Sequence, residues 1–230
     1  MPFVIPPLPQ PSVPVVGGGD FAVRRIYCVG RNYVEHAQEM GFTGREPPFF
    51  FMKPADAVLP VADGATGQIS YPTQTKNLHF EIELVVAVGR GGRDIAVADA
   101  VSHIWGYAIG LDMTRRDLQG EMKKQGRPWC IGKAFDESAP IGPLHAIAAT
   151  GELKRGAITL ATNGQQRQKG DLSELIWNVP EVIATLSQAW TLQPGDLIFT
   201  GTPAGVGPVV AGDLMEGAIE GLGTLRVQVK

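Results

Sequence analysis

Residues 79–89 read HFEIELVVAVG, a run of apolar and β-branched residues that ends at a glycine. Such a run predicts a buried strand over residues 79–88, closed by Gly89. Two acids, Glu81 and Glu83, interrupt the apolar residues. Because residues two apart in a strand share a face, both carboxylates are expected to point the same way.

These two acids have two interpretations. Like charges side by side in an apolar strand repel each other and lose hydration, a cost that a divalent cation removes. At a solvent-facing strand edge, by contrast, paired acids are ordinary. Glu81 and Glu83 alone leave both interpretations open.

Asp112 shifts the balance toward a metal site. It follows the apolar stretch Gly106–Leu111, where a strand is expected to end beside its neighbours. Three carboxylates, without Cys-rich or His-rich spacing, suit Mg²⁺ or Mn²⁺ rather than structural zinc. His79 is expected to pack beside the ligands rather than to be one.

The rest of the chain predicts short strands and few helices. Expected strands cover residues 25–29, 49–52, 105–111, 157–162, 196–200 and 224–229. Expected helices cover residues 33–40, 97–104, 115–124 and 180–190, with Thr114 and Asp117 as a capping box for the third. Strands outnumber helices without βαβ alternation, so the sequence predicts an α+β, mainly β fold.

Composition narrows the function classes. The 230 residues are 44% hydrophobic, enough for one large domain with a sizeable core. The net charge of −3 lacks the basic excess of a nucleic-acid binder, and no apolar run approaches the roughly 18 residues of a membrane span. Residues 1–19, rich in proline and glycine, form an expected arm ahead of a domain over 20–230. Cys28 and Cys130 lie among apolar residues and are expected to be core residues of a cytoplasmic protein.

Further side chains have the spacing of a catalytic site. His36 and Glu39 lie three apart, so the carboxylate can orient the imidazole as a general base. Arg116, Gln119 and Lys133 could together clamp a carboxylate or an oxyanion near a metal. The alternatives are a surface hydrogen bond for the first pair and solvated side chains for the other three.

The stretch 200–207, TGTPAGVG, is glycine-rich but fits neither the Walker pattern nor the dinucleotide-binding spacing. It predicts either a plain tight turn or a loop whose amides, with Thr202, bind a small anion. Both remain open on the sequence.

Together these motifs resemble the fumarylacetoacetate hydrolase family. The similarity covers roughly residues 22–230, through Cys28-Val29-Gly30-Arg31-Asn32-Tyr33 with His36 and Glu39, Phe51-Met52-Lys53-Pro54, Glu81-x-Glu83, Gly110-Leu111-Asp112-Met113-Thr114-x-Arg116-Asp117-x-Gln119, Lys133, and Gly201-Thr202-Pro203-x-Gly205-Val206-Gly207. The chain looks most like the short members, the acylpyruvate and fumarylpyruvate hydrolases. That resemblance implies their mixed β-sandwich or roll.

The resemblance also implies a role for each matching residue. By this match the metal ligands, for Mg²⁺ or Mn²⁺, are Glu81, Glu83 and Asp112. The water-activating pair is His36 and Glu39, and Lys133 polarises the substrate or stabilises the oxyanion. The positions that hold the ketoacid end are Arg116, Gln119, Lys53 and Thr202.

The implied activity is metal-dependent hydrolysis of the C–C bond of an acylpyruvate, with fumarylpyruvate giving fumarate and pyruvate. The resemblance places this reaction in the degradation of aromatic compounds, as in the gentisate pathway. It implies a homodimer that binds a small β-diketo acid and neither nucleic acid nor membrane.

Two differences from the long family members argue against fumarylacetoacetate as the substrate of this chain. Residues 27–29 contain no acid where the long members have one, and the proline-rich arm replaces their N-terminal domain. An alternative function is decarboxylation of oxaloacetate, or tautomerisation of a ketoacid, at the same metal. An alternative of another class is a non-catalytic ketoacid-binding protein.

Overall fold

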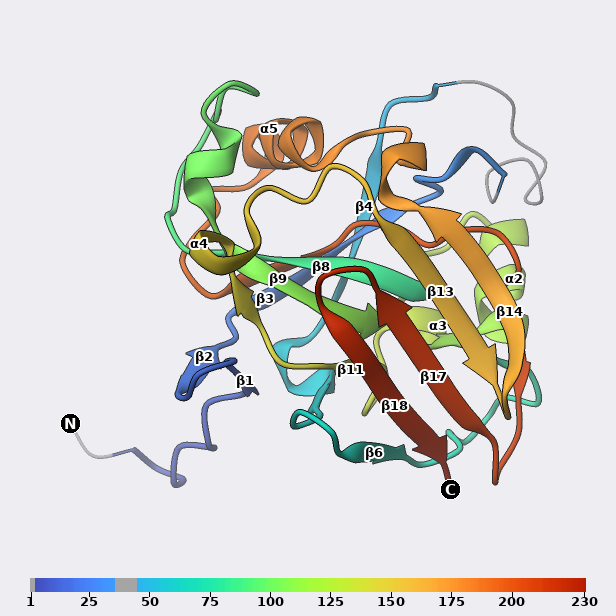
Figure 1. Cartoon of the computed structure of the whole chain (residues 1–230). Helices are drawn as coiled ribbons and strands as arrows, with labels where there is room; N and C mark the ends of the chain where they lie inside the picture. Colours follow the sequence, from blue (N-terminus) through green and yellow to red (C-terminus); the bar gives the residue numbers. More distant parts are fainter. Residues whose placement is uncertain (1–2, 36–44) are drawn as a thin grey trace.

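The computed structural model describes residues 3–35 and 45–230, which form mostly β-strands (Figure 1). In this described part the larger sheet has eight strands, ordered β4-β3-β15-β8-β9-β11-β5 with β12 beside β9. Their bounds are Phe49–Lys53 (β4), Arg25–Gly30 (β3), Asp196–Phe199 (β15), Ile82–Val88 (β8), Ile104–Leu111 (β9), Ala139–Ile141 (β11), Val58–Pro60 (β5) and His145–Ala146 (β12).

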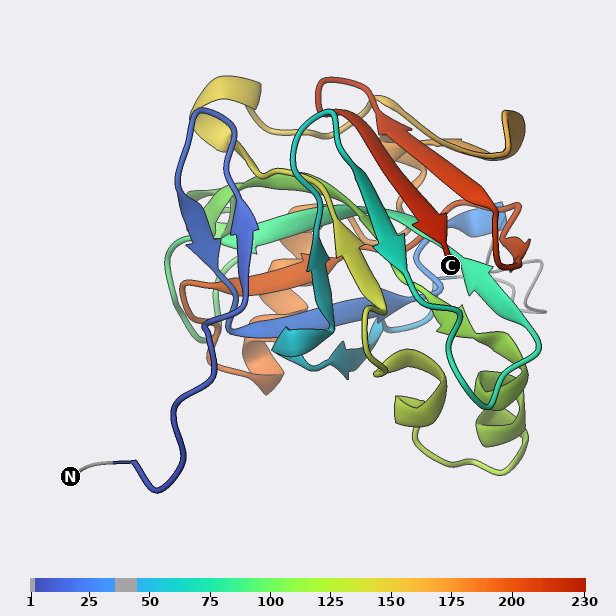
Figure 2. The ribbon, with the colours of Figure 1, turned by 90° about the horizontal axis from the view of Figure 1, so that it is seen from below.

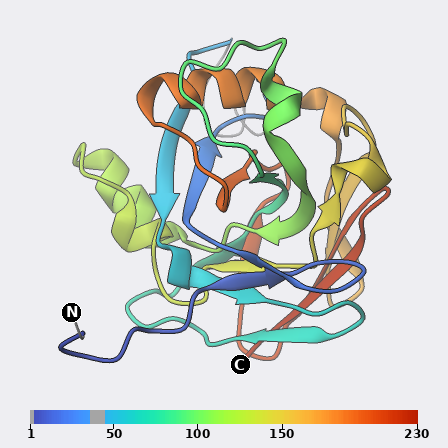
Figure 3. The ribbon, with the colours of Figure 1, turned by 90° about the vertical axis from the view of Figure 1, so that its left-hand side faces the viewer.

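A second sheet packs against one face of the first. Among the described residues it has five strands: Gln165–Asp171 (β14), Ala157–Thr162 (β13), Leu214–Ile219 (β17), Gly223–Val229 (β18) and Thr66–Ile69 (β6). Leu160, Met215 and Val227 of this sheet share one core with Leu84 and Val86 of β8. In Figure 3 its gold and red strands lie on the right of the molecule. Both sheets combine parallel and antiparallel pairs, as a mixed β-sandwich does.

Smaller elements join and cover these sheets. A hairpin is formed by β1 (Ser12–Pro14) and β2 (Asp20–Ala22), seen in blue at the left of Figure 2, and a short sheet by β10 (Thr114–Arg115), β7 (Leu78–Phe80) and β16 (Gly207–Val209). The helices are α2 (Arg116–Lys124), α3 (Cys130–Lys133), α4 (Ile147–Thr150), α5 (Val179–Ala189), η1 (Ala55–Ala57), η2 (Ala100–His103) and η3 (Leu172–Glu174). Within the described ranges, every helix is too short or too polar to cross a bilayer.

Strand β8 lies inside the larger sheet and is buried on both faces. Leu84 and Val86 face the core between the two sheets, whereas Val85 and Ala87 face a second core. The hairpin β1–β2 covers this second core through Val13. Burial on both faces explains why this stretch is apolar at nearly every position instead of alternating.

The fold class predicted from the sequence, α+β and mainly β, is confirmed. The six shorter strands expected from the sequence correspond to β3, β4, β9, β13, β15 and β18, with ends that differ by one or two residues. The helix expected over 180–190 is α5. Its capping box is formed by Asn178 and Glu181, and Pro180 lies in its first turn.

The continuous strand expected over 79–88 is wrong, because the chain changes sheets at Glu81. Strand β7 pairs with β10 and β16, whereas β8 pairs with β9 and β15. Strand-forming residues lie on both sides of Glu81, so the local pattern contains no sign of the break. The break leaves Glu81 between the short sheet that contains β7 and the larger sheet that contains β8. There its side chain and that of Glu83 converge.

Two helix predictions need correction. Helix α2 begins at Arg116, and neither side chain of the expected capping box caps it. Thr114 Oγ1 donates instead to the Asp112 carbonyl at 3.1 Å, and the Asp117 carboxylate accepts from Thr75 Oγ1 at 2.6 Å. The helix expected over 97–104 is only the short η2, since residue 104 already belongs to β9.

Other expectations have mixed outcomes. Most of the helix expected over 33–40 lies outside the described residues. Cys28 is buried as expected, but Cys130 is exposed, because it begins the surface helix α3 while its neighbour Trp129 packs inward on Phe51. Within the expected arm, residues 12–14 form strand β1.

Candidate active site

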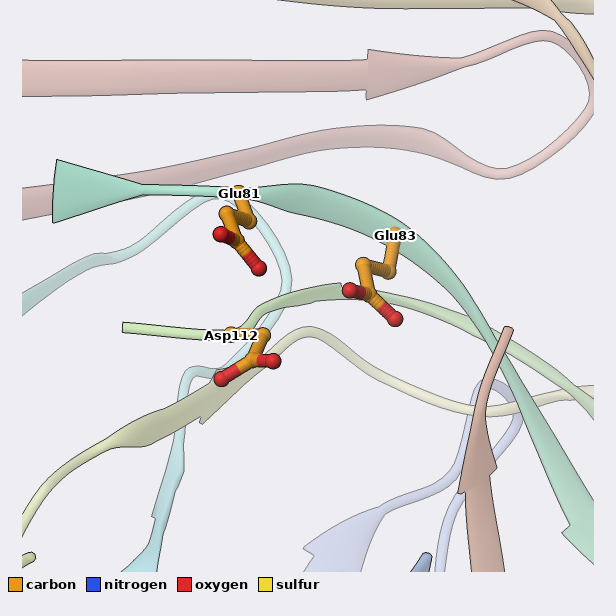
Figure 4. Close-up of side chains that lie close together, drawn as sticks. All are labelled: Glu81, Glu83 and Asp112. Atoms are coloured by element: carbon orange, nitrogen blue, oxygen red, sulfur yellow. The ribbon is translucent and has the colours of Figure 1, made fainter. Parts of the chain in front are cut away.

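Three buried carboxylates meet at one end of β8. Glu81 precedes β8, Glu83 lies on it, and Asp112 directly follows β9. Their ligating oxygen atoms lie within 4.8 Å of one another, and all three residues are at most 5% exposed. Figure 4 shows the three carboxylates turned toward a common point.

The pairing of β8 with β9 creates this convergence. Glu83 stands opposite Gly110 in the antiparallel register, so Asp112, two residues further on, comes opposite Glu81. The Asp112 amide donates to the Glu81 carbonyl at 2.9 Å, which fixes the two backbones beyond the strand ends. The amide of Gly201, at the end of β15, donates to Glu83 Oε2 at 2.7 Å.

Three cationic side chains surround the acids. Lys133 Nζ, from α3, donates to Glu81 Oε2 at 2.8 Å and to Asp112 Oδ2 at 2.7 Å. Lys53 Nζ, from β4, lies 2.8 Å from Asp112 Oδ1. The Arg116 guanidinium, from α2, forms an ion pair with Glu81 Oε1. The side chains of Lys53 and Lys133 are at most 2% exposed, so these charges interact with little screening by water.

Burial and charge shift the pKa values of the site. Burial, with the neighbouring Asp112 and Glu81 carboxylates, raises the pKa of Glu83 well above its usual range. Burial alone would lower the pKa of Lys133, but the two acids outweigh it and the pKa is raised. The cluster therefore favours added positive charge, whether a proton or a cation.

The donor set fits a divalent metal ion. It offers only carboxylate oxygen atoms, which are the ligands that Mg²⁺ and Mn²⁺ prefer. Because burial and the neighbouring acids raise the pKa of Glu83, a metal ion and a proton compete for this carboxylate. Each of the three acids also contacts a hydrogen-bond donor or a cation of the protein, which holds its side chain in place.

His79 lies beside the cluster. Its Nε2 is 2.9 Å from Asn77 Oδ1, and its Nδ1 accepts from Arg116 Nε at 3.4 Å. Burial, followed by the Arg116 charge, lowers the pKa of His79 to about 4. The ring is therefore neutral near pH 7 and helps to orient Arg116.

A narrow pocket with a cavity volume of about 20 Å³ lies over the acids. Gln119 Oε1 accepts from Arg116 Nη1 at 2.7 Å, so the two side chains present one polar surface to this pocket. Thr202 lines the pocket and accepts at Oγ1 from Gln168 Nε2 at 2.8 Å. The arrangement can hold an anionic ligand between a metal site and a set of hydrogen-bond donors.

The structure brings together most of the residues singled out from the sequence. Those that line this pocket, or directly contact a residue that does, are Lys53, Glu81, Glu83, Asp112, Arg116, Gln119, Lys133 and Thr202. The alternative that Gln119 and Lys133 are solvent-exposed side chains is wrong, since both are buried. His36 and Glu39 lie outside the described residues.

Sequence reasoning missed Gln168. This buried residue accepts from the Ile82 amide at 3.0 Å and donates to Thr202 Oγ1 and the Pro203 carbonyl, so it joins the start of β8 to the glycine-rich loop. It lies in the polar run QQRQK, which contains no pattern that separates it from its neighbours. The aromatic residues Phe51 and Trp129, which line the pocket, also had no predicted role.

Comparisons with known proteins agree with this geometry. The family model of the fumarylacetoacetate (FAA) hydrolase C-terminal domain matches residues 25–230. A crystal structure of fumarylpyruvate hydrolase from Pseudomonas aeruginosa, in complex with Mn²⁺ and pyruvate, is 56% identical, covers 99% of both chains and superposes with a TM-score of 0.98.

Two curated relatives have different names. Fumarylpyruvate hydrolase of Ralstonia sp is 46% identical over 80% of this chain and 93% of its own length. The mitochondrial oxaloacetate tautomerase of Homo sapiens is 41% identical over 90% of this chain and 92% of its own. Proteins similar to this chain are thus named for two different activities, fumarylpyruvate hydrolysis and oxaloacetate tautomerisation.

The metal site can be tested by Glu83→Gln. The substitution keeps an acceptor for the Gly201 amide but removes the carboxylate charge. We expect it to lower Mn²⁺ affinity at least ~10-fold in isothermal titration, since loss of a ligand should cost no less than loss of a group that supports one. The fold should persist, because the raised pKa of Glu83 already favours an uncharged side chain here.

A matched control is Glu216→Gln. Glu216 forms a partly exposed ion pair with Arg226 and does not line the pocket over the acids. This control should bind Mn²⁺ like the wild type. A Glu83→Gln protein with unchanged Mn²⁺ affinity would show that the cluster is not a metal site.

Proposed function

Because this chain belongs to the fumarylacetoacetate hydrolase family, we propose that it is a metal-dependent hydrolase that cleaves the C–C bond of an acylpyruvate. The preferred substrate in this proposal is fumarylpyruvate, which gives fumarate and pyruvate. The observation that carries the proposal is the cluster of Glu81, Glu83 and Asp112, buried in a pocket that also presents Arg116 and Lys133. The similarity to two fumarylpyruvate hydrolases supports the choice of substrate.

The cofactor in this proposal is Mg²⁺ or Mn²⁺ held by Glu81, Glu83 and Asp112. When bound, the ion supplies Lewis acidity to the neighbouring keto and enolate oxygens of a diketo acid. The Mn²⁺ in the related Pseudomonas aeruginosa structure supports this assignment.

The ketoacid end is held by the polar surface of α2. A planar guanidinium can bind a carboxylate through two parallel hydrogen bonds, so Arg116 takes the pyruvate carboxylate in this scheme. Gln119 fixes the orientation of that guanidinium through its 2.7 Å hydrogen bond and adds a neutral donor. Lys53 and Thr202 complete the binding site at its buried end.

Hydrolysis then needs a base and an oxyanion partner. His36, oriented by Glu39, takes a proton from water, and the resulting hydroxide attacks the distal carbonyl carbon. Lys133 stabilises the tetrahedral oxyanion. The C–C bond breaks with its electron pair passing to the pyruvate carbon, and protonation of that enolate releases pyruvate beside the second carboxylic acid. The roles of His36 and Glu39 rest on the family resemblance.

A second candidate function is oxaloacetate decarboxylation or tautomerisation. The similarity to the human oxaloacetate tautomerase favours it. Both reactions require stabilisation of an enolate but no attacking water, so they would use the acids and Lys133 without His36. A non-catalytic binding protein is less favoured, because ligand binding alone does not require a water-activating base such as His36.

The homodimer, the cytoplasmic location and the place in aromatic-compound degradation belong to the same proposal. Light scattering of the purified chain measures the first of these directly.

The experiment that tests the proposed function is a substrate panel. Loss of the ultraviolet absorbance of the diketo-enol group is followed for fumarylpyruvate and acetylpyruvate, beside a separate assay for oxaloacetate. We expect acylpyruvate cleavage that stops with a chelator and returns with Mg²⁺ or Mn²⁺. Turnover of oxaloacetate alone would make the second candidate correct, and binding without any turnover would indicate the binding protein.

The base can be tested by His36→Ala, with Glu35→Ala as the control, since the neighbouring Glu35 is exposed. We expect His36→Ala to lower acylpyruvate hydrolysis by about 10² or more while most oxaloacetate turnover remains. The control should keep both activities. Equal loss of both activities in His36→Ala would mean that this histidine does not activate water.

A further inference from the structure

One cation of the pocket has no part in the mechanism above. Arg31 lies at the end of β3 and lines the same pocket as Glu81 and Lys133. Its side chain is 20% exposed, and Nη1 of its guanidinium is buried. This nitrogen lies 3.6 Å from a carboxylate oxygen of the exposed Glu46.

The backbone of Arg31 is held in an unfavourable conformation. Its φ is 55°, in the left-handed region that side chains other than glycine rarely adopt. The next residue fixes it: Asn32 donates to the carbonyls of Trp177 and Thr200 at 2.9 and 2.8 Å and accepts from the Trp177 amide at 2.8 Å. A strained backbone conformation persists where the contacts around it hold it in place, and such conformations are common at ligand-binding sites.

Aromatic rings hold the side chain and extend from it into the pocket. The Arg31 guanidinium stacks over Phe49, 4.6 Å from the ring centroid. Trp129 contacts both Phe49 and Phe51, with centroids 5.4 and 5.8 Å apart, and Phe51 in turn lies under Lys133 Nζ. A row of aromatic rings, set edge-on or tilted to one another, therefore runs from Arg31 to the lysine at the acid cluster.

The charges of the pocket favour a ligand with more than one negative group. Among the described residues that line the pocket, the cationic side chains Arg31, Arg116 and Lys133 equal the carboxylates Glu81, Glu83 and Asp112 in number. A divalent ion on the acids would therefore give the lining of the pocket an excess of two positive charges. The enolate of a diketo acid with one carboxylate carries two negative charges, and that of a dicarboxylic diketo acid carries three.

We propose that Arg31 binds the distal carboxylate of the acyl group and so selects dicarboxylic acylpyruvates. With Arg116 at the ketoacid end, the two guanidinium groups grip opposite ends of the ligand. The aromatic rings beside Arg31 offer an apolar surface for the carbon chain of the acyl group. This inference rests on the proposed function, and it makes Arg31 the residue that distinguishes fumarylpyruvate from acetylpyruvate.

The test compares Arg31→Met on these two substrates. Methionine keeps an unbranched chain that can pack on Phe49, and it tolerates the left-handed backbone no worse than arginine. We expect KM for fumarylpyruvate to rise about 10- to 100-fold, the loss of a charge-assisted pair of hydrogen bonds. The loss of kcat/KM on acetylpyruvate should be at least tenfold smaller.

Two further variants calibrate the result. Arg115→Met removes another stacked arginine, which lies 4.4 Å from the Phe135 centroid and does not line the pocket, and it should behave as wild type. Arg116→Lys should impair both substrates alike, because both share the ketoacid end. Equal losses on the two substrates in Arg31→Met, or none on either, would overturn the proposal.

Failure of the proposed function would give a different result. If the wild-type enzyme cleaves neither acylpyruvate, the hydrolase proposal is wrong. The dissociation constants of the intact fumarylpyruvate and acetylpyruvate, measured with Mn²⁺ present, then replace the kinetic constants. A ratio of the two constants that Arg31→Met leaves unchanged would exclude a role for Arg31 in selecting the ligand.

Discussion

Three carboxylates buried within 4.8 Å of one another repel each other. At the effective dielectric constant of ~20 that fits most protein sites, each pair of unit charges at this distance costs about 3–4 kcal/mol, before any loss of hydration. The surrounding structure offsets this repulsion. Lys53, Lys133 and Arg116 bring three positive charges, and the Gly201 amide donates a hydrogen bond to Glu83.

These partners come from separate parts of the chain. Lys53 is on β4, Arg116 on α2, Lys133 on α3, and Gly201 follows β15, so the acids are balanced only when both the sheet and the helices are formed. Buried ion pairs of this kind contribute little net stability compared with apolar residues of similar volume. Their retention in the core is therefore better explained by the chemistry of the pocket than by the stability of the fold.

Much of this site could be predicted from the sequence because the acids interrupt apolar strands. Glu81 and Glu83 within a valine-rich run, and Asp112 at the end of another, stand out against residues that otherwise only fill a core. The break at Glu81 was missed because β-propensity continues across it, and the change of sheet depends on distant strands.

Tertiary context hid other features. Asp117 has the spacing of a capping residue, yet its carboxylate accepts a hydrogen bond from the Thr75 hydroxyl. Backbone amides at the start of a helix compete for such a carboxylate with every other donor within reach. Gln168 joins two parts of the site from a polar run in which no residue differs visibly from its neighbours. The position of Arg31 depends on backbone strain and on Phe49, neither of which has a sequence pattern of its own.

The most direct test of this account is anomalous diffraction at the manganese edge from crystals grown with Mn²⁺. We predict one strong peak within coordination distance of Glu81, Glu83 and Asp112, with Lys133 Nζ moved away from at least one of the two carboxylates, Glu81 and Asp112, that it contacts in the structure described above. A map without a peak there, in which Lys133 still bridges Glu81 and Asp112, would mean that the lysine is the permanent counter-ion of the cluster. The acids would then be a structural charge network rather than a metal site.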